Sequence, residues 1–210
     1  LTYDIMKRHA KKALLVGNIE IPYTGYALES DKDSVTVAEI SSFQLETMVT
    51  FKPHVTAILN ITPDHLDRHK TLENYIAIKE SITKNQDEND FCVLNYNDPV
   101  LREFGKTPRC KVIFFSSSEE LESGVFLRGD TMIIKENGVE TPVCTTKDTS
   151  LVGMHNYENI MAAIAMTHAM GVPLDTIRQG IKEFTAVEHR IEFVAEKNGV
   201  KYYNDSKGTN

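Results

Sequence analysis

Two short runs of mainly apolar, β-branched residues each end in polar residues that could do chemistry. The runs Val35–Ile40 and His54–Ile61 are typical of buried parallel strands whose carboxyl ends open into a site. Ligands bind at the carboxyl edge of the strands in an open α/β sheet. We therefore expect these two strand ends to be neighbours, with their polar side chains facing one crevice. The side chains expected there are those of Glu39, Gln44, Asn60, Asp64 and His65.

A hard cation such as Mg²⁺ fits these side chains best. Glu39 offers a carboxylate and His65 an imidazole, and Mg²⁺ accepts few protein ligands when water and phosphate complete its coordination. His65 and His69 also stand four residues apart, as in HExxH zinc sites. However, the acidic residue between them, Asp67, is at the wrong position for that motif, and Pro63 places the start of the segment in a turn. The sequence predicts a magnesium site, with a zinc site as the alternative.

Lys79 lies on the apolar stripe of a predicted helix. The run Thr71–Thr83 has apolar residues at helical spacing, and Lys79 falls on the same face. A lysine on the inward face must extend its ammonium group to water or have its charge neutralised or altered. The spacing of the residues does not decide between these two alternatives. The stripe consists of Leu72, Tyr75, Ile76 and Ile82.

Two further motifs are weaker. Ser41 and Ser42 are not surrounded by the GxSxG elbow of a nucleophile, so we expect a serine here to cap the following short helix. Gly105 is followed by lysine and threonine, but Val100 stands where a phosphate loop needs its first glycine. The sequence therefore contains no phosphate loop.

Composition narrows the class of protein. The chain has 210 residues, of which 41% are hydrophobic and 25% charged, which is ordinary for a globular protein of one large domain. A net charge of −7 argues against a nucleic-acid surface. Three widely spaced cysteines without a CxxC pair suit a reducing compartment, with the thiols as small core residues.

No apolar run approaches the roughly 18 residues that span a bilayer, and the basic segment Leu1–Lys12 is not a signal peptide. We expect a cytoplasmic protein without a membrane insertion.

Strands and helices alternate along most of the chain, which favours an α/β fold with a doubly wound, mostly parallel sheet flanked by helices. Later short strands joined by Gly129-Asp130 and Asn137-Gly138 predict a small antiparallel ribbon, and Asn198-Gly199 predicts a hairpin. The other expected strands are Ala13–Val16, Phe91–Leu94, Lys111–Phe115, Val125–Leu127, Thr131–Lys135, Thr141–Cys144, Arg190–Glu196 and Val200–Tyr203. The expected helices are Thr2–Ala10, Ile21–Leu28, Pro99–Phe104, Tyr157–Met170 and Leu174–Phe184.

Five motifs occur in an order that resembles the Mur ligases, a family of ATP-dependent, amide-forming ligases of peptidoglycan synthesis. They are EISSFQLE at 39–46, NITPDHLDRH at 60–69, GMHNYEN at 153–159, EHR at 188–190 and NDSKGTN at 204–210. The SSFQLE form resembles the members that add D-glutamate to UDP-N-acetylmuramoyl-L-alanine through an acyl phosphate. The alternatives are a non-catalytic module of the same fold, or a related ligase such as a folylpolyglutamate synthetase or another Mur ligase.

The resemblance also implies a domain organisation. Residues 1–210 correspond to the central ATPase domain, without the phosphate loop, the N-terminal UDP-binding domain or the C-terminal domain that receives the amino acid. The chain alone is then expected to be inactive and monomeric. Glu20 stands where the family's GNIG motif has glycine, so the sequence departs from the family at this turn.

Roles for individual residues follow from the resemblance. Glu39 and His65 would be ligands of Mg²⁺, and Lys79 would carry the family's N-carboxylation beside the metal, so these three form the expected catalytic set. The muramoyl-alanine substrate would contact Asn18, Ser41 and Gln44. The nucleotide, ATP, would be held by Asn159, Arg190, Asp205 and Lys207, with Lys207 and Thr209 in the hinge motif.

Overall fold

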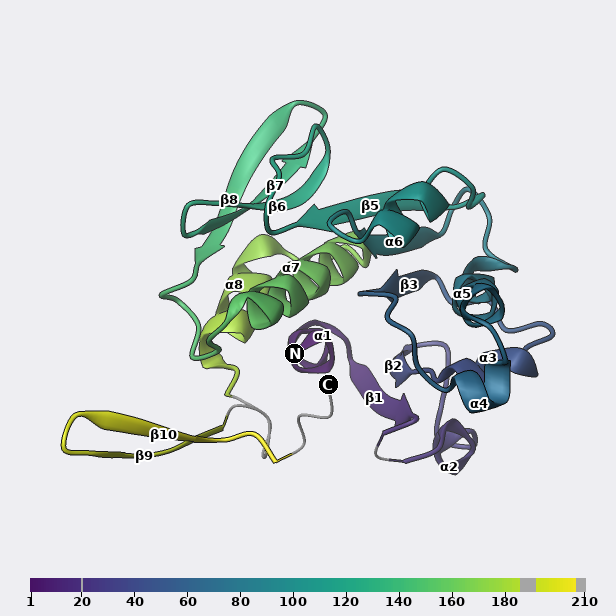
Figure 1. Ribbon diagram of the computed structural model, residues 1–210, viewed down its shortest axis with the longest axis horizontal. Helices are drawn as coiled ribbons and strands as arrows, with labels where there is room; N and C mark the ends of the chain where they lie inside the picture. Colours follow the sequence, from purple (N-terminus) through teal and green to yellow (C-terminus); the bar gives the residue numbers. More distant parts are fainter. Residues whose placement is uncertain (20, 186–191, 207–210) are drawn as a thin grey trace.

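A six-stranded mixed sheet forms the centre of the part of the chain that the computed structural model describes, which is residues 1–19, 21–185 and 192–206 (Figure 1). Its first four strands are parallel, and the last two continue the sheet in antiparallel pairs. In order across the sheet the strands are β3 (Val55–Ile58), β4 (Phe91–Asn95), β5 (Lys111–Ser116), β6 (Gly124–Arg128), β7 (Thr131–Glu136) and β8 (Val139–Thr145). The predicted α/β class with a mostly parallel sheet is confirmed, and the predicted antiparallel ribbon is continuous with that sheet.

Two strands form a separate parallel pair. β1 (Lys12–Gly17) aligns with β2 (Ser34–Glu39) in register, with Gly17 opposite Glu39. Within the described ranges, β2 has no hydrogen-bonded partner except β1, and β3 pairs only with β4. The prediction that the strands at Val35–Ile40 and His54–Ile61 are neighbours is therefore wrong. An apolar run specifies a buried strand, but the partner depends on contacts far away in the sequence.

Gly17 is required where β1 meets β2. Its φ is +114°, and a Cβ placed there would lie 2.1 Å from the carbonyl oxygen of Glu39. We expect Gly17→Ala to lower the free energy of unfolding by more than the roughly 1–3 kcal/mol that a strained backbone conformation costs, because a clash is added to the strain. Urea denaturation measures the difference.

The matched control for Gly17 is Gly138→Ala. Gly138 also has a positive φ, +78°, but an added Cβ would meet no atom within 4 Å. It should lose only the strain contribution. Equal losses of stability in the two variants would show that close approach to Glu39 does not matter at Gly17.

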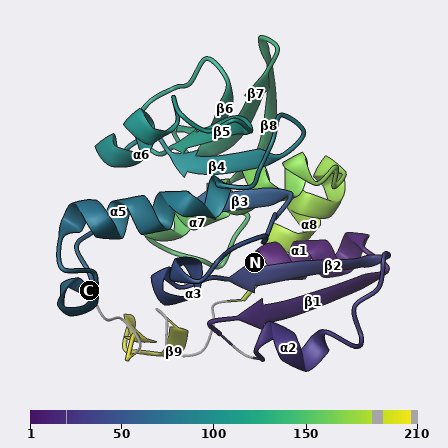
Figure 2. The ribbon, with the colours of Figure 1, turned by 90° about the vertical axis from the view of Figure 1, so that its right-hand side faces the viewer.

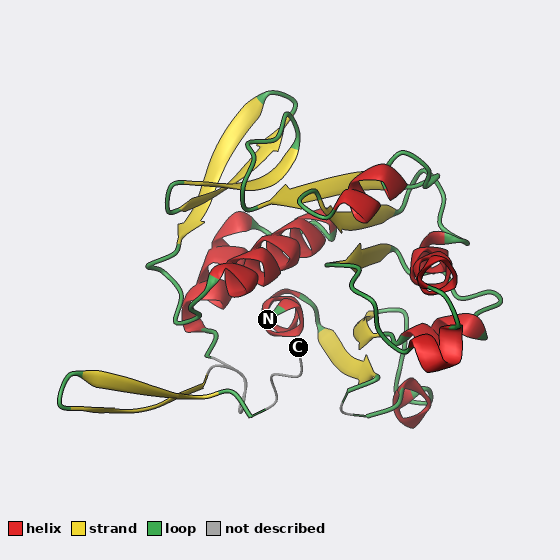
Figure 3. Cartoon of the chain, in the orientation of Figure 1, coloured by secondary structure: helices red, strands yellow, loops and turns green. Residues whose placement is uncertain are grey.

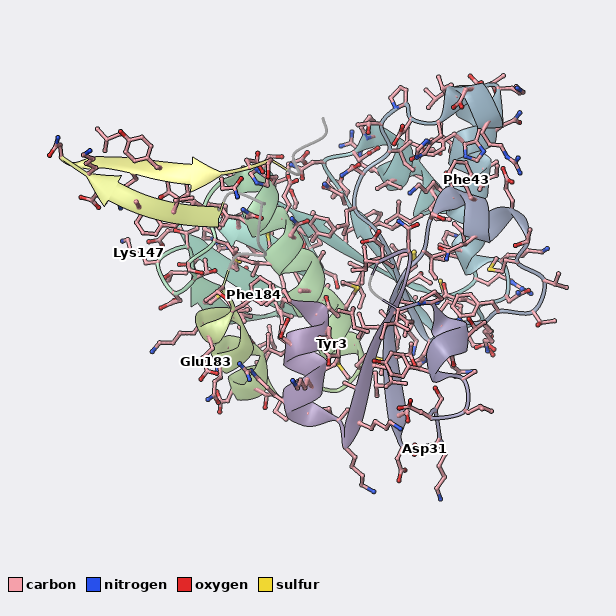
Figure 4. The ribbon with its side chains drawn as sticks, turned by 90° about the horizontal axis from the view of Figure 1, so that it is seen from below. Tyr3, Asp31, Phe43, Lys147, Glu183 and Phe184 are labelled. Atoms are coloured by element: carbon pink, nitrogen blue, oxygen red, sulfur yellow. The ribbon has the colours of Figure 1, made fainter. Side chains whose placement is uncertain are left out.

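The largest helix, α7 (Met154–Ala169), covers one face of the six-stranded sheet and contacts four of its strands, β3 to β6 (Figure 1). Small residues allow it to pack closely, since Ala162, Ala163 and Ala165 are each 1% exposed. It also contacts α1 (Thr2–His9) and α8 (Leu174–Glu183). Figure 4 labels Tyr3 on α1 and Glu183 on α8.

Short helices follow the strands. The stripe helix predicted at Thr71–Thr83 is present as an α-helix followed by a 3₁₀ turn, η1 (Ser81–Thr83). The helix predicted at Ile21–Leu28 is only one turn long, with Pro22 at its N-cap rather than inside it. The short helices are α2 (Tyr23–Tyr26), α3 (Ser42–Glu46), α4 (Leu66–His69), α5 (Leu72–Glu80) and α6 (Pro99–Phe104).

The predicted tight turns are confirmed. Asn137 and Gly138 both have positive φ between β7 and β8, as do Asn198 and Gly199 between β9 (Glu192–Lys197) and β10 (Val200–Asn204). Positive φ at both central residues is the geometry of a type I′ hairpin turn. The β9–β10 hairpin stands apart from the other strands (Figure 3).

The cysteines are core residues. All three are buried, and burial raises the pKa of the Cys144 thiol to about 12. A hydrogen bond with the Cys110 thiol, together with burial, raises the pKa of Cys92. The thiols of Cys92 and Cys144 are therefore held in the protonated form at neutral pH.

An ion cluster fastens the amino-terminal edge of β3 and β4. The ammonium group of Lys52 contacts the carboxylates of Asp87 and Asp90, and the Asp90 carboxylate also lies 3.0 Å from Nδ1 of His54. The hydrogen bond from Lys52 lowers the pKa of Asp87 to about 2. The Asp87 carboxylate is thus ionised throughout the neutral range.

Lys52→Met should make the free energy of unfolding depend less on pH in the acidic range. Because the folded-state pKa of Asp87 lies below the value of about 3.9 for an unfolded chain, its contribution is present above about pH 4 and is lost as the pH falls towards 2. Wild type should therefore exceed the variant in unfolding free energy at pH 6, with the gap closing between pH 4 and 2 in urea titrations. Lys32→Met, outside the cluster, is the control. A gap that stays constant with pH would contradict the assignment.

Candidate functional site

The three residues of the expected catalytic set lie at the ends of adjoining segments. Glu39 ends β2, His65 is the N-cap of α4, and Lys79 is in the last turn of α5. α3 begins shortly after Glu39 and packs against α5, which in turn contacts α4. Figure 2 shows α3 at the carboxyl end of β2 with α5 on the same side of the molecule. Packing between helices, rather than pairing between β2 and β3, thus brings the segments together.

Glu39 and Asn18 are held together at the tips of β1 and β2. The Asn18 side-chain amide donates a hydrogen bond of 3.1 Å to Glu39 Oε1, and its backbone N–H donates one of 2.7 Å to the Glu39 carbonyl oxygen. Both side chains are exposed. Asn18, the expected substrate contact, and Glu39, the expected metal ligand, therefore lie at one site. The sequence did not predict their contact.

His65 has a constrained backbone and an accessible ring. Its φ of 52° is in the left-handed region, which is uncommon outside glycine and clusters at functional sites. Asp64 stabilises this turn, because its carboxylate accepts a hydrogen bond of 2.8 Å from the His65 backbone N–H and lies 3.5 Å from the ring. The ring packs 4.9 Å from the ring of Phe43. His65 is thus fixed in direction while its side chain stays 47% exposed.

Lys79 is half-buried on the predicted stripe. Its Nζ lies 5.6 Å from the centre of the Tyr75 ring, and Tyr75 itself is 7% exposed. Burial, and then the negative charge of Asp64, raise the pKa of Tyr75. α5 also contacts α4, whose N-cap is His65, so the helix that carries Lys79 lies beside the segment that carries His65.

Ser41 and Gln44 form a capping box at the start of α3. The Ser41 hydroxyl accepts a hydrogen bond of 3.3 Å from the Gln44 backbone N–H, and Gln44 Oε1 accepts one of 2.9 Å from the Ser41 N–H. The expected capping role of a serine is confirmed. Gln44 is exposed, and a substrate contact there stays a prediction.

Sequence reasoning overlooked a buried polar cluster around His69. The His69 ring lies 3.0 Å from Ser42 Oγ through Nε2 and 3.2 Å from Glu46 Oε1 through Nδ1. Its side chain is completely buried, which sets it apart from the exposed His65. The spacing of the two histidines was the only signal in the sequence, and it pointed to zinc. Across the described ranges, no three histidine, cysteine or acidic side chains are grouped for a metal.

The expected nucleotide residues are only partly described. Asn159 is exposed on α7, and its neighbour Glu158 accepts a hydrogen bond of 2.6 Å from Ser117, the residue after β5. Asp205 follows β10 directly. The predictions for Glu20, Arg190, Lys207 and Thr209 fall outside the described residues.

The donor chemistry at Glu39 and His65 suits a hard cation. One carboxylate and one imidazole, both exposed, leave most coordination positions to water and phosphate, as Mg²⁺ prefers. A closed zinc site needs about four protein ligands, and His69 is engaged with Ser42 and Glu46 instead. The residues present fit Mg²⁺ better than zinc.

The described helices include no candidate for a membrane span, since none combines the required length with an apolar sequence.

Fold and site together define an open-sheet α/β domain with polar residues gathered where strands end. The family model of the Mur ligase middle domain matches residues 1–167. The chain belongs to the Mur ligase family.

Two similar curated proteins carry the same enzyme name. The chain is 52% identical over 210 residues to the UDP-N-acetylmuramoylalanine--D-glutamate ligase of Lachnoclostridium phytofermentans, covering 100% of this chain and 46% of that protein. It is 50% identical over 210 residues to the ligase of the same name from Lachnospira eligens, covering 47% of it. The chain therefore spans about half the length of the curated relatives it matches.

Solved structures of Mur ligases share the fold. MurF from Acinetobacter baumannii superimposes with a TM-score of 0.70 at 20% identity, covering 93% of this chain and 44% of that one. MurF from Thermotoga maritima, solved in complex with ADP, gives a TM-score of 0.69 at 19% identity, covering 97% and 49%. At such identities the likeness concerns the fold alone.

Proposed function

We propose that this chain is the central, ATP-using domain of a cytoplasmic ligase that joins D-glutamate to UDP-N-acetylmuramoyl-L-alanine. The observation that carries the proposal is the 52% identity over all 210 residues to a protein named for that reaction. The site supports it, since Glu39, His65 and Lys79 lie on adjoining segments. The phosphate loop, the UDP-binding domain and the amino-acid domain would belong to parts of the ligase outside residues 1–210.

The proposed reaction has two steps. ATP phosphorylates the alanyl carboxylate of the substrate, giving an acyl phosphate and ADP. The amine of D-glutamate then attacks the carbonyl carbon, and the tetrahedral intermediate collapses to an amide and inorganic phosphate. Catalysis of such transfers depends mainly on positioning and on neutralising phosphoryl charge.

Different residues are proposed to contact the muramoyl-alanine substrate and the nucleotide. Asn18, already bonded to Glu39, and Gln44 at the start of α3 would contact the muramoyl-alanine part, with Ser41 beside them. Asn159 and Asp205 would contact the adenosine, and Arg190 and Lys207 the phosphates. These assignments extend the family resemblance onto this chain.

Glu39 and His65 would hold Mg²⁺. When bound, the ion would supply positive charge to the phosphates of ATP and the acyl phosphate. Lys79 would carry a carbamate, formed when its neutral amine adds to CO₂ and releases a proton. The carbamate would place a negative charge beside the ring of Tyr75, where the half-buried ammonium group otherwise lies.

Amino-acid selection tests the proposal. The ligase containing this chain is assayed for release of phosphate with UDP-N-acetylmuramoyl-L-alanine, ATP and either D-glutamate, L-alanine or meso-diaminopimelate. We expect turnover with D-glutamate alone. Turnover with another amino acid would point to a different Mur ligase, and no turnover with any would support the non-catalytic alternative.

The domain assignment has its own test. The 210-residue chain, purified alone, should release no phosphate from ATP above the buffer rate, because residues 1–210 hold no phosphate-loop sequence. Hydrolysis by the chain alone at the rate of the ligase would contradict the assignment.

A further inference from the structure

His69 is enclosed by side chains from three helices. Its side chain is 0% exposed. One face stacks on Phe43, with ring centres 5.5 Å apart and planes inclined by 20°, and the ring also lies 5.4 Å from that of Tyr75. Nε2 contacts the hydroxyl of Ser42, a residue that is 3% exposed. A polar ring in such a place costs free energy unless its nitrogens are matched.

Each of these contacts is made by a segment that carries, or directly follows, a residue of the proposed metal site. Ser42 and Phe43 begin α3, directly after the segment that holds Glu39. His69 ends the single turn of α4, of which His65 is the N-cap. Tyr75 is on α5, one turn before Lys79, whose Nζ lies 5.6 Å from the centre of the same ring. Figure 4 places the labelled Phe43 among these helices.

The Nδ1 side of the ring faces the Glu46 carboxylate without an aligned hydrogen bond. Nδ1 lies 3.2 Å from Glu46 Oε1, yet it is the buried side-chain polar atom without a hydrogen-bond partner in the described part of the chain. Arg68 fixes the Glu46 carboxylate through a contact of 2.7 Å, and this hydrogen bond lowers the pKa of Glu46. A buried polar atom of this kind in a native fold calls for an explanation in strain or function.

We infer that His69 is a positioning residue that sets the distance between Glu39 and His65, and thereby the affinity of the site for a divalent cation. The inference rests on the proposed function. His69 does not touch the cation. It acts by joining α3 to α4 through Ser42 and Glu46, and α4 to α5 through Tyr75. Partners that orient metal ligands commonly change metal affinity by about 10- to 100-fold.

The main test replaces the ring and measures the cation. His69→Leu fills a similar volume without polar atoms, whereas His69→Gln can still offer its amide to Ser42. In the ligase, we expect His69→Leu to raise the Mg²⁺ concentration for half-maximal rate by about tenfold or more, with kcat at saturating Mg²⁺ within about threefold of wild type. His69→Gln should lie between wild type and His69→Leu. Mn²⁺ binding, followed by electron paramagnetic resonance without substrates, should weaken in the same order.

His54→Gln is the matched control. His54 also contacts a buried carboxylate, that of Asp90, but it lies at the amino-terminal edge of the sheet. This variant should lower the melting temperature and leave both the Mg²⁺ requirement and Mn²⁺ binding unchanged. The comparison separates a loss of stability from a loss of metal affinity.

Each outcome decides between the inference and its alternative. A fall in melting temperature in His69→Leu with unchanged Mn²⁺ binding would overturn the inference and leave the proposed function intact. Wild-type ligase that binds Mn²⁺ but makes no product with D-glutamate would overturn the proposed function, while the Mn²⁺ series would still decide on His69. If His69→Leu fails to fold, Ser42→Ala and Glu46→Gln each remove one contact, and unchanged Mn²⁺ binding in both would equally overturn the inference.

Discussion

Replacing Lys79 with alanine is expected to lower kcat of the ligase by about 10²- to 10³-fold, the usual cost of losing one charged group aimed at the reacting phosphoryl or carbonyl centre. The physical reason is the position of the side chain. Its Nζ lies over the Tyr75 ring on the half-buried face of α5, and α5 contacts α4, whose N-cap is His65. Alanine would remove both the amine and any carbamate on it. Steady-state release of phosphate at saturating substrates gives the number.

Chemical rescue distinguishes a carbamate from a simple cation at position 79. Acetate or propionate can occupy the space left in Lys79→Ala and restore a carboxylate, so we expect partial recovery of rate with either acid. Methylammonium, which restores a positive charge, should not rescue. Lys84→Ala, at an exposed lysine just after η1, is the control and should keep the wild-type rate. Wild-type activity in Lys79→Ala, or rescue by the amine alone, would contradict the carbamate proposal.

Replacing Glu39 with alanine should raise the Mg²⁺ concentration for half-maximal rate by about 100-fold or more, since a direct ligand should matter at least as much as the partners that orient one. Glu39→Gln refines the test. Glutamine keeps an oxygen that can accept the hydrogen bond from Asn18, which now measures 3.1 Å, but it removes the charge. We expect Glu39→Gln to resemble Glu39→Ala, because the cation requires the charge.

The control for Glu39 is Glu73→Gln. Glu73 is an exposed carboxylate in the first turn of α5 and lies outside the proposed site. Its Mg²⁺ titration should overlay that of wild type. An unchanged titration in both Glu39 variants would exclude a role as ligand.

Strands and turns were predictable because their signals are local. The run Phe91–Leu94 is buried on both faces, as its apolar sequence indicates, and Asn137-Gly138 makes the expected turn. Strand pairing was not predictable. Val35–Ile40 and His54–Ile61 have the same texture, but the first joins β1 and the second joins β4, because pairing is decided by contacts distant in sequence.

In the candidate site, too, local features were predictable from the sequence and features that depend on packing were not. Spacing placed Lys79 on the buried stripe of its helix, and the fold confirms this position. Spacing could not reveal the left-handed backbone of His65, which depends on the Asp64 carboxylate, nor the burial of His69 between α3 and α5. Two histidines four residues apart looked alike in sequence, and only packing made one exposed and the other a buried link.

The most direct measurement is the position of the divalent cation in crystals of the ligase grown with ADP and Mn²⁺ in place of Mg²⁺. The anomalous signal of Mn²⁺ locates the ion without assumptions about its ligands. We expect one peak at about 2–2.3 Å from both a Glu39 carboxylate oxygen and a His65 ring nitrogen, with the Lys79 side chain turned towards the same ion. A peak held by other residues, with Glu39, His65 and Lys79 facing away from one another, would contradict a shared metal site.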